Sequence, residues 1–230
     1  MSVYEYGDHE LQKIKVWNYS DNNENTFIYI HGGAWRDPNN TYDELKTVAE
    51  NNPQATFIGI NYRLSPEVKH PDHYLDVYTA LSYIHFNYKY KKIHLMGYSV
   101  GATICLQLIQ HLHDRKSPIH FNSIKFLDGI YDIEELLNEY PSYISFVNDA
   151  FSKLDEADES INLLKKPNID KNTSIIIVQS LQDELLSMSQ TKLLIDYFVI
   201  WDIGFTLLTG NWGKHDDIYG AHRSEIFMKV

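Results

Sequence analysis

Short apolar runs alternate along this chain with longer segments of helical period. The runs predict strands over residues 26–31, 55–62, 92–97, 123–128, 174–179 and 204–209. The longer segments predict helices over 42–51, 72–88, 100–112 and 188–201, one beginning near Ile133, and a short one at the C-terminus. Several runs, such as the IIIV of the fifth strand, are apolar on both faces, which is typical of a parallel sheet covered by helices. We therefore expect an α/β fold with a mostly parallel central sheet and helices on both faces.

The helix predicted over 72–88 has a clear periodicity. Its apolar positions recur at three- and four-residue spacing on one face, at Tyr74, Val77, Leu81 and Ile84. Asp72 directly follows Pro71, and we predict that its side chain is the N-cap of this helix.

No repeat, low-complexity stretch or linker divides the chain, so we expect a single domain over residues 1–230. The least regular part is 138–173, which carries the charged run KLDEADES and Pro167. We expect a small insertion there, over the end of the sheet at which an active site would lie. Because the chain is short, we expect no extensive lid.

Composition narrows the classes of partner. The 230 residues (26.9 kDa) are 43% hydrophobic and 22% charged, which is typical of a globular domain and excludes a disordered or fibrous chain. The 31 acidic residues exceed the 20 basic ones and leave a net charge of −11, which repels phosphate backbones and anionic lipid. We therefore expect neither nucleic acid nor a membrane as a partner.

The compartment follows from the cysteine content and from the first residues. The single cysteine, Cys105, allows no internal disulfide, which fits a reducing compartment. The first twenty residues contain acids and lack the apolar core of a secretory signal. No apolar run approaches the roughly 20 residues that a membrane helix needs. We therefore expect a cytoplasmic protein.

The motif Gly97-Tyr98-Ser99-Val100-Gly101 is the sharpest chemical signal in the chain. It lies directly between a predicted strand and a predicted helix. A serine at this spacing occupies a strained turn, and the small residues on either side let the strand and the helix approach each other. The turn exposes the hydroxyl at the N-terminus of the helix. Ser99 is therefore the candidate nucleophile.

A second motif, His31-Gly32-Gly33-Ala34, ends the first predicted strand. Acyl transfer needs preorganised N–H donors for an oxyanion, and a Gly-Gly turn leaves main-chain N–H groups unobstructed. We assign these donors to the backbones of Gly33 and Ala34, with Val100, the residue after the nucleophile, as a third. The His31 ring is expected to fix the loop.

A nucleophilic serine needs a base, and the base needs an acid that orients it. Asp183 follows the fifth predicted strand and His215 follows the sixth, so they are the candidate acid and the candidate base. Glu184 stays open as the acid, because a one-residue register error would exchange it with Asp183. His222 competes as the base but is expected on the surface of the final helix.

The other histidines and the cysteine have structural interpretations. His70 and His73 begin a helix without a third metal ligand nearby, so we predict loop and cap roles for them. His111 and His113 lie at a helix end, where imidazoles suit the dipole. Cys105 is predicted to be a small core residue.

Together these motifs resemble the α/β-hydrolase superfamily, and within it the esterases with an HGG oxyanion loop and an NYRLSP segment, here residues 61–66. More narrowly, the chain resembles the fungal kynurenine formamidases, which are arylformamidases of tryptophan catabolism. The segments that carry the resemblance are HGGAWRDPNN at 31–40, YRLSPE at 62–67, GYSVGAT at 97–103, LDGIYDIEELL at 127–137, DELL at 183–186 and, more weakly, HDDIY at 215–219. The resemblance spans nearly the full length. Ala34 departs from the broader esterase pattern, in which many relatives have a third glycine.

The resemblance implies an α/β-hydrolase fold with a minimal lid and a triad of Ser99, Asp183 and His215. It implies hydrolysis of N-formyl-L-kynurenine to L-kynurenine and formate through a formyl-serine intermediate, on the kynurenine route towards NAD, with no metal and no cofactor. A general short-chain carboxylesterase stays an alternative. A non-catalytic binding protein of the same fold is a more distant one.

Three further residues are candidates for contact with a small-molecule substrate. Trp35 either stacks on the substrate ring or packs the loop. Arg36 is a candidate for binding the substrate carboxylate, with a solvent-exposed role as the alternative. Tyr98, inside the nucleophile motif, is the third. The sequence is also compatible with a homodimer.

Overall fold

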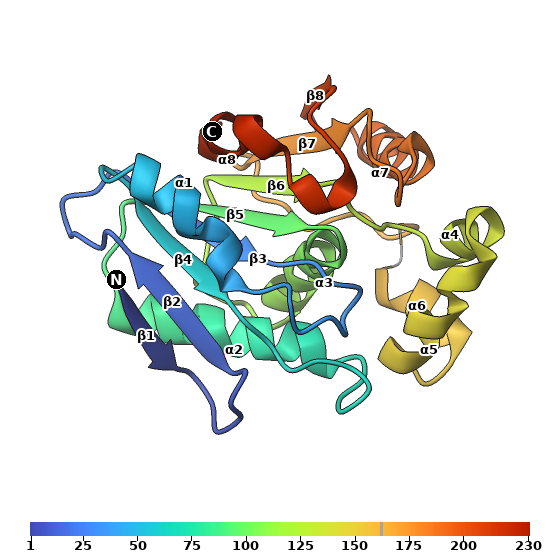
Figure 1. The fold of residues 1–230 in the computed structure, drawn as a ribbon, viewed down its shortest axis with the longest axis horizontal. Helices are drawn as coiled ribbons and strands as arrows, with labels where there is room; N and C mark the ends of the chain where they lie inside the picture. The colour runs from blue at the N-terminus through green and yellow to red at the C-terminus, as the bar shows by residue number, and fades with distance from the viewer. Residues whose placement is uncertain (162) are drawn as a thin grey trace.

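The computed structural model describes residues 1–161 and 163–230, and it leaves the side chains of 158–160 undescribed. Within the described residues, eight strands form one sheet in the order β1-β2-β4-β3-β5-β6-β7-β8 (Figure 1). The strands are β1 (Ser2–Glu5), β2 (Lys13–Trp17), β3 (Asn25–Ile30), β4 (Thr56–Ile60), β5 (Lys92–Tyr98), β6 (Ser123–Leu127), β7 (Ser174–Ser180) and β8 (Thr206–Gly210). The six strands from β4 to β8 in this order are parallel, whereas β1 and β2 pair antiparallel at one edge.

Helices cover both faces of this sheet, as the sequence predicts. The α-helices are α1 (Lys46–Asn51), α2 (Asp72–Asn87), α3 (Val100–Asp114), α4 (Ile133–Glu139), α5 (Ile144–Ala150), α6 (Leu154–Ile161), α7 (Met188–Ile200) and α8 (Arg223–Met228). Short 3-10 helices occur at Tyr42–Leu45, Pro141–Tyr143, His215–Asp217 and Gly220–His222. Figure 1 shows α2 and α3 on one side of the sheet and α1 and α8 on the other.

The alternation of side chains along β3 explains the two layers of core. Ile28 and Ile30 point to the face covered by α2, α3 and α7, where they join the larger apolar cluster. Phe27 and Tyr29 point to the opposite face, where they pack with residues of α1 and α8. A strand that is buried on both faces reads as a continuous apolar run, which is why these strands were visible in the sequence.

The parallel strands bring six loops to one end of the sheet. The carboxyl ends of β4, β3, β5, β6, β7 and β8 all lie at this end, because parallel strands run in the same direction. The HGG motif follows β3, the serine motif follows β5, and the candidate acid and base follow β7 and β8. The topology therefore gathers residues that are far apart in the sequence.

Several local predictions were wrong. The strands β1 and β2 were not predicted: every side chain of β1 is exposed, so it carries no apolar pattern. The segment predicted as one helix over 42–51 is divided into a 3-10 turn and α1. Asp72 is the first residue of α2 and not its N-cap; the cap position is Pro71, which has no side-chain hydrogen bond to offer.

The segment 138–173, expected as an insertion, contains the short helices α5 and α6. Figure 1 shows α4, α5 and α6 beyond the arrowheads of β5 and β6. Residue 162 and part of the charged run KLDEADES lie outside the described residues and side chains. That the chain is one domain with an insertion stays a prediction. No helix of the described chain is both long enough and apolar enough to cross a membrane.

Candidate active site

Ser99 lies at the turn between β5 and α3 with a strained backbone. Its φ of 55° and ψ of −123° lie in a region that few non-glycine residues adopt. The Ser99 N–H donates to the Leu127 carbonyl at 2.9 Å, and the Ala102 N–H donates to the Ser99 carbonyl at 2.9 Å. These bonds hold the strained turn between two strands and a helix. This is the geometry that the G-x-S-x-G motif predicts for an exposed nucleophile.

The two glycines of the motif are required by close backbone contact. A Cβ on Gly97 would lie 2.1 Å from the Gly101 carbonyl oxygen, and a Cβ on Gly101 would lie 2.3 Å from the Ile30 carbonyl oxygen. Neither contact is sterically allowed, and both partners are backbone atoms that cannot move aside. The glycines therefore let α3 begin directly against β3 and β5.

The loop after β3 follows a left-handed path beside Ser99. Gly33, Ala34 and Trp35 have φ values of 92°, 50° and 58°. A Cβ on Gly32 would lie 3.0 Å from the Ser99 Cβ, so the loop approaches the serine closely. Within the described chain, no hydrogen bond uses the N–H of Ala34 or Val100. These N–H groups are therefore free to serve as donors to a ligand.

Buried side chains fix this loop from behind. The His31 ring stacks on Tyr62, with centroids 4.4 Å apart, and the Tyr62 hydroxyl donates to the His31 carbonyl at 3.1 Å. Burial lowers the pKa of His31 to about 4, so its ring is neutral and structural, as predicted. Asn40 packs against Gly33 and donates to the Glu44 carboxylate at 3.0 Å. Sequence reasoning missed Asn40 and Glu44, because only the folded loop shows what lies beneath it.

Asp183 and His215 form a buried hydrogen-bonded pair. Asp183 Oδ2 lies 2.7 Å from His215 Nδ1, and the Asp183 side chain is inaccessible to solvent. Asp183 Oδ1 accepts from the N–H groups of Leu185 and Leu186, both at 2.9 Å. Glu184 instead accepts from the His215 main-chain N–H at 3.1 Å. The imidazole is therefore oriented by Asp183, while Glu184 holds the backbone of the same residue.

The partners of His215 decide which ring nitrogen is available for chemistry. Its Nδ1 is engaged by Asp183, which leaves Nε2. The Tyr98 hydroxyl donates to the His215 carbonyl at 2.5 Å and holds the residue from the other side. None of the hydrogen bonds of the described chain joins Ser99 to His215, although both residues line one cavity. Such contacts commonly shorten only when substrate binds.

The charges around His215 favour its protonated form. Burial alone lowers the pKa of the imidazole, but the hydrogen bond and charge of Asp183 outweigh burial, and Asp128 and Asp216 act in the same direction. The pKa of His215 is therefore raised above its ordinary value of 6.5. An imidazole in this environment is a stronger base than one in water.

Asp128 is a second buried carboxyl group beside this pair, and sequence reasoning did not single it out. It directly follows β6, has a φ of 40°, and accepts from the Ser180 N–H at 2.8 Å. Ser180 in turn donates its hydroxyl to the Gly213 carbonyl at 2.6 Å, in the loop that carries His215. Burial, together with the charge of Asp183, raises the pKa of Asp128 to about 7. An acid directly after a strand, at the end of the sheet where the site lies, was the signal that could have found it.

The candidate nucleophile, base and oxyanion donors open onto one cavity of about 360 Å³. Ser99, Val100, Gly33, Ala34 and His215 are among its lining residues. Its apolar walls are formed by Ile130, Tyr143, Phe146, Leu185, Leu186 and Ile218. Charged residues at the cavity are Arg36, Asp37 and Asp216. The cavity therefore offers a small molecule both apolar walls and charged groups.

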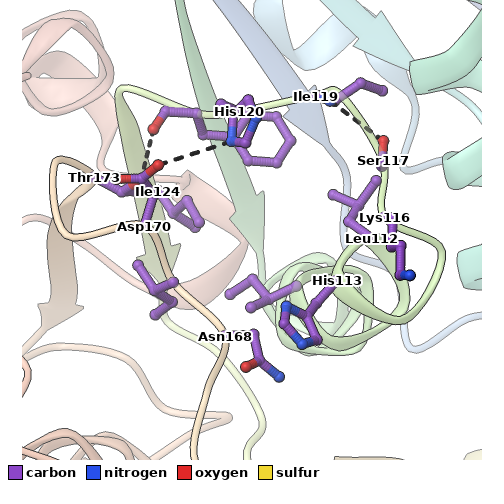
Figure 2. A pocket seen from close by; sticks show the side chains of 13 residues that line it. Leu112, His113, Lys116, Ser117, Ile119, His120, Ile124, Asn168, Asp170 and Thr173 are labelled. Carbon is purple, nitrogen blue, oxygen red and sulfur yellow. Dashed lines mark hydrogen bonds and ion pairs between the residues drawn. The ribbon is translucent and has the colours of Figure 1, made fainter.

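A second cavity, of about 430 Å³, lies at the other end of the parallel strands, near the amino ends of β6 and β7. Figure 2 shows residues from the end of α3, the start of β6 and the segment before β7 around it. It contains a serine and two histidines, Ser117, His113 and His120, but Ser117 accepts a hydrogen bond from the Ile119 N–H and His120 lies 3.8 Å from Asp170. It lacks the strained serine turn and the buried acid–base pair. The candidate site is therefore the smaller cavity.

The three candidate substrate contacts have different placements. Trp35 is 1% exposed, packs on Phe146 and Phe151 with centroids 6.0 and 5.3 Å apart, and does not line the cavity. This placement favours loop packing over stacking on a substrate. Arg36 and Tyr98 both line the cavity, but the Tyr98 hydroxyl is already bonded to His215.

The remaining histidines lie away from the site. His222 is exposed at the N-cap position of α8, 3.9 Å from Glu225. The predicted cap or solvated role of His73 was wrong: it is 2% exposed inside α2 and lies 3.0 Å from the Ser65 hydroxyl. In the described part of the chain, no three His, Cys, Asp or Glu side chains gather in a way that could hold a metal ion. Cys105 is buried in the core, as predicted.

Comparison with known proteins agrees with the fold and with the motifs. Residues 27–190 match the family described as the alpha/beta hydrolase fold. The kynurenine formamidase of Meyerozyma guilliermondii is 41% identical, over 96% of this chain and 89% of that protein. The kynurenine formamidase of Saccharomyces cerevisiae is 31% identical, over 87% of this chain and 85% of that protein. Esterase B of Lactobacillus rhamnosus has a similar fold, with a TM-score of 0.78 at 17% identity, over 97% of this chain and 80% of that one.

Proposed function

This chain belongs to the alpha/beta hydrolase fold family and, within it, to the kynurenine formamidases, and on that premise we propose that it hydrolyses N-formyl-L-kynurenine to L-kynurenine and formate. The proposed nucleophile is Ser99, the base is His215 and the acid is Asp183. The reaction serves the kynurenine pathway of tryptophan degradation, towards NAD. The observation that carries the proposal is that the buried Asp183–His215 pair and the strained Ser99 turn open onto the same cavity.

The first half of the reaction forms a formyl-serine. His215 Nε2 takes the hydroxyl proton of Ser99 as the serine oxygen attacks the formyl carbon. The carbonyl π electrons move onto the formyl oxygen, which the N–H groups of Gly33, Ala34 and Val100 stabilise by hydrogen bonding. The imidazolium then gives its proton to the aryl nitrogen as the C–N bond breaks. L-Kynurenine leaves with a free aromatic amine.

The second half releases formate. His215 takes a proton from water as the water oxygen attacks the formyl-serine carbon, and the same N–H groups stabilise the second oxyanion. When the tetrahedral intermediate collapses, the serine oxygen leaves and recovers its proton from His215. The acyl group carries only a hydrogen atom, so the presence of the Ala34 methyl group in the cavity wall is compatible with a formyl substrate. A formanilide is also easier to cleave than a peptide, because its nitrogen lone pair is shared with the ring.

The proposal is tested by substrate preference. We expect kcat/KM for N-formyl-L-kynurenine to exceed that for 4-nitrophenyl butyrate, because the cavity offers charged groups to the amino-acid end of the substrate. Initial rates on the two substrates, with one enzyme preparation, measure the ratio. A preference for the ester would instead favour the general carboxylesterase. Saturable binding of N-formyl-L-kynurenine without turnover would favour the non-catalytic binding protein.

The pH dependence of the reaction tests the environment of His215. Since the base must be neutral and its pKa is raised, we expect kcat/KM to fall on the acid side with a midpoint above 6.5. The Asp128→Asn variant should move this midpoint to lower pH, because it removes a negative charge that favours the imidazolium. The measurement is a pH profile of kcat/KM for both proteins.

Asparagine is the appropriate replacement because it keeps an oxygen that can accept from the Ser180 N–H. A loss of fold or of loop geometry is therefore not expected from Asp128→Asn. Asp128 and His215 titrate in overlapping ranges, so the wild-type midpoint belongs to the coupled pair. If kcat falls while the midpoint stays in place, Asp128 has no electrostatic effect on the base and serves only to hold Ser180.

The compartment and the assembly state are also proposals. A free, fully buried Cys105 supports a reducing compartment, for which we propose the cytoplasm. The proposed partner is the small-molecule substrate alone, apart from a second copy of the chain in a homodimer. Sedimentation at micromolar concentration tests the dimer.

A further inference from the structure

The proposed function leaves one part of the substrate without a binding partner. Ser99 and the oxyanion loop act on the formanilide, whereas the other end of N-formyl-L-kynurenine is an α-amino acid with a carboxylate and an ammonium group. Two residues of opposite charge at the cavity, Arg36 and Asp216, have no assigned contact with the substrate, although the charge of Asp216 also helps to raise the pKa of His215. They come from different loops: Arg36 follows the oxyanion loop, and Asp216 directly follows the catalytic histidine.

Arg36 has one edge of its guanidinium occupied and another edge available. Its Nη1 donates to the Ser145 hydroxyl at 3.0 Å and to Asp149 Oδ2 at 2.8 Å. No hydrogen bond in the described chain uses Nε or Nη2 of this residue. These two nitrogens form the planar edge that binds a carboxylate through two parallel hydrogen bonds. The contacts of Nη1 therefore orient the side chain and leave a carboxylate-binding edge.

Asp216 offers a free carboxylate at the same cavity. Its side chain is exposed, and none of the hydrogen bonds of the described chain includes its carboxylate oxygens. The other acid at the cavity, Asp37, differs because its Oδ1 already accepts from the main-chain and side-chain N–H groups of Asn39, at 2.9 and 2.8 Å. Asp216 is therefore the better acceptor for an ammonium group, which brings three donors.

Apolar side chains line the same cavity as the nucleophile and these charges. Phe146 lines the cavity and also lies beneath Arg36, with the guanidinium carbon 6.0 Å from the ring centroid. Tyr143 and Ile130 line the cavity as well. These residues offer an apolar surface to the aromatic ring of the substrate, in the cavity that Arg36 and Asp216 also line.

We propose that Arg36 and Asp216 form a subsite for the zwitterionic α-amino-acid end of the substrate, in which Arg36 binds the carboxylate through Nε and Nη2 and Asp216 binds the ammonium group. This inference rests on the proposed function. It makes the two residues determinants of specificity, since neither side chain forms a bond to the formanilide or transfers a proton in the proposed mechanism.

Truncated substrates test each half of the subsite separately. The decarboxylated analogue, 3-amino-1-(2-formamidophenyl)propan-1-one, lacks the group for Arg36. The deaminated analogue, 4-(2-formamidophenyl)-4-oxobutanoate, lacks the group for Asp216. Each experiment measures a selectivity, defined as kcat/KM for N-formyl-L-kynurenine divided by kcat/KM for one analogue. A change in the reactivity of Ser99 or His215 cancels from this ratio, because all three substrates share the formanilide.

Arg36→Gln should lower the selectivity over the decarboxylated analogue by roughly 10- to 100-fold, because a charge-assisted pair of hydrogen bonds is lost. Arg36→Lys should give an intermediate loss, because it keeps a cation near Asp149 but lacks the planar edge. Asp216→Asn should lower the selectivity over the deaminated analogue by about tenfold, since this carboxylate is exposed. Asp196→Asn, the same change of charge at an exposed position on α7, is the control and should alter neither ratio.

The outcomes separate the subsite from the function. If the wild-type enzyme cleaves all three formanilides and neither Arg36→Gln nor Asp216→Asn changes its ratio, the subsite is wrong while the proposed function stands. If Asp37→Asn gives the loss expected of Asp216→Asn, the ammonium partner is Asp37 and the assignment is overturned. If the wild-type enzyme cleaves none of the formanilides, it is the proposed function that fails.

Discussion

Replacing Ser99 by alanine is expected to lower kcat for N-formyl-L-kynurenine by about 10⁴- to 10⁶-fold, because no acyl-enzyme can form. The residual rate should still exceed that in water, since the oxyanion donors and the cavity remain. The free energy of unfolding should change little, because the Ser99 side chain has no hydrogen-bond partner in the described chain and alanine keeps the same strained backbone. Single-turnover kinetics measure the chemical step, and thermal unfolding shows that the variant is folded.

A matched serine separates this effect from a general disturbance. Ser117 lines the larger cavity at the other end of the parallel strands, and Ser117→Ala should leave kcat close to that of the wild type. An alkyl fluorophosphonate should modify the wild-type protein at Ser99, as peptide mass spectrometry would show, and should not modify Ser99→Ala. Retention of a tenth or more of the wild-type activity by Ser99→Ala would assign the nucleophile to another group.

The parts of the site that could be predicted from sequence are those that local geometry dictates. A serine in a left-handed turn between a strand and a helix needs small neighbours on both sides, and the requirement lies within five residues. The HGG loop can likewise be recognised from a few adjacent residues. The buried strands were visible because both of their faces are covered, whereas β1, with every side chain exposed, left no signal.

The parts that could not be predicted depend on contacts between distant segments. Asp128 matters because it meets Ser180, 52 residues later, and nothing in either local sequence indicates the other. The role of Trp35 was undecided because its exposure is set by Phe146, in α5, and Phe151, directly after α5, more than 100 residues along the chain. Which of two adjacent acids points to an imidazole depends on the path of one turn, and a sequence does not specify that path.

Replacing Asp183 by asparagine is expected to lower kcat by about 10⁴-fold while the protein stays folded. The carboxylate accepts a hydrogen bond from the His215 Nδ1–H, whereas an amide that presents its NH₂ group would favour the tautomer with the proton on Nε2. That tautomer cannot take the proton of Ser99. The variant should also shift the acid side of the pH profile to lower pH, because Asp183 raises the pKa of the imidazole.

Glu184 is the natural control for Asp183, since the two acids are adjacent and both contact His215. Glu184→Gln keeps an oxygen that can accept from the His215 main-chain N–H, so kcat should fall only a few-fold, by roughly the effect of weakening one partly buried hydrogen bond. The measurement is kcat and its pH profile for both variants. It compares the loss of the hydrogen bond to the His215 ring, made by Asp183, with the weakening of the hydrogen bond to the His215 main chain, made by Glu184. If Glu184→Gln shows the large loss and Asp183→Asn the small one, the catalytic acid is Glu184, and the turn after β7 must adopt a different path when substrate is bound.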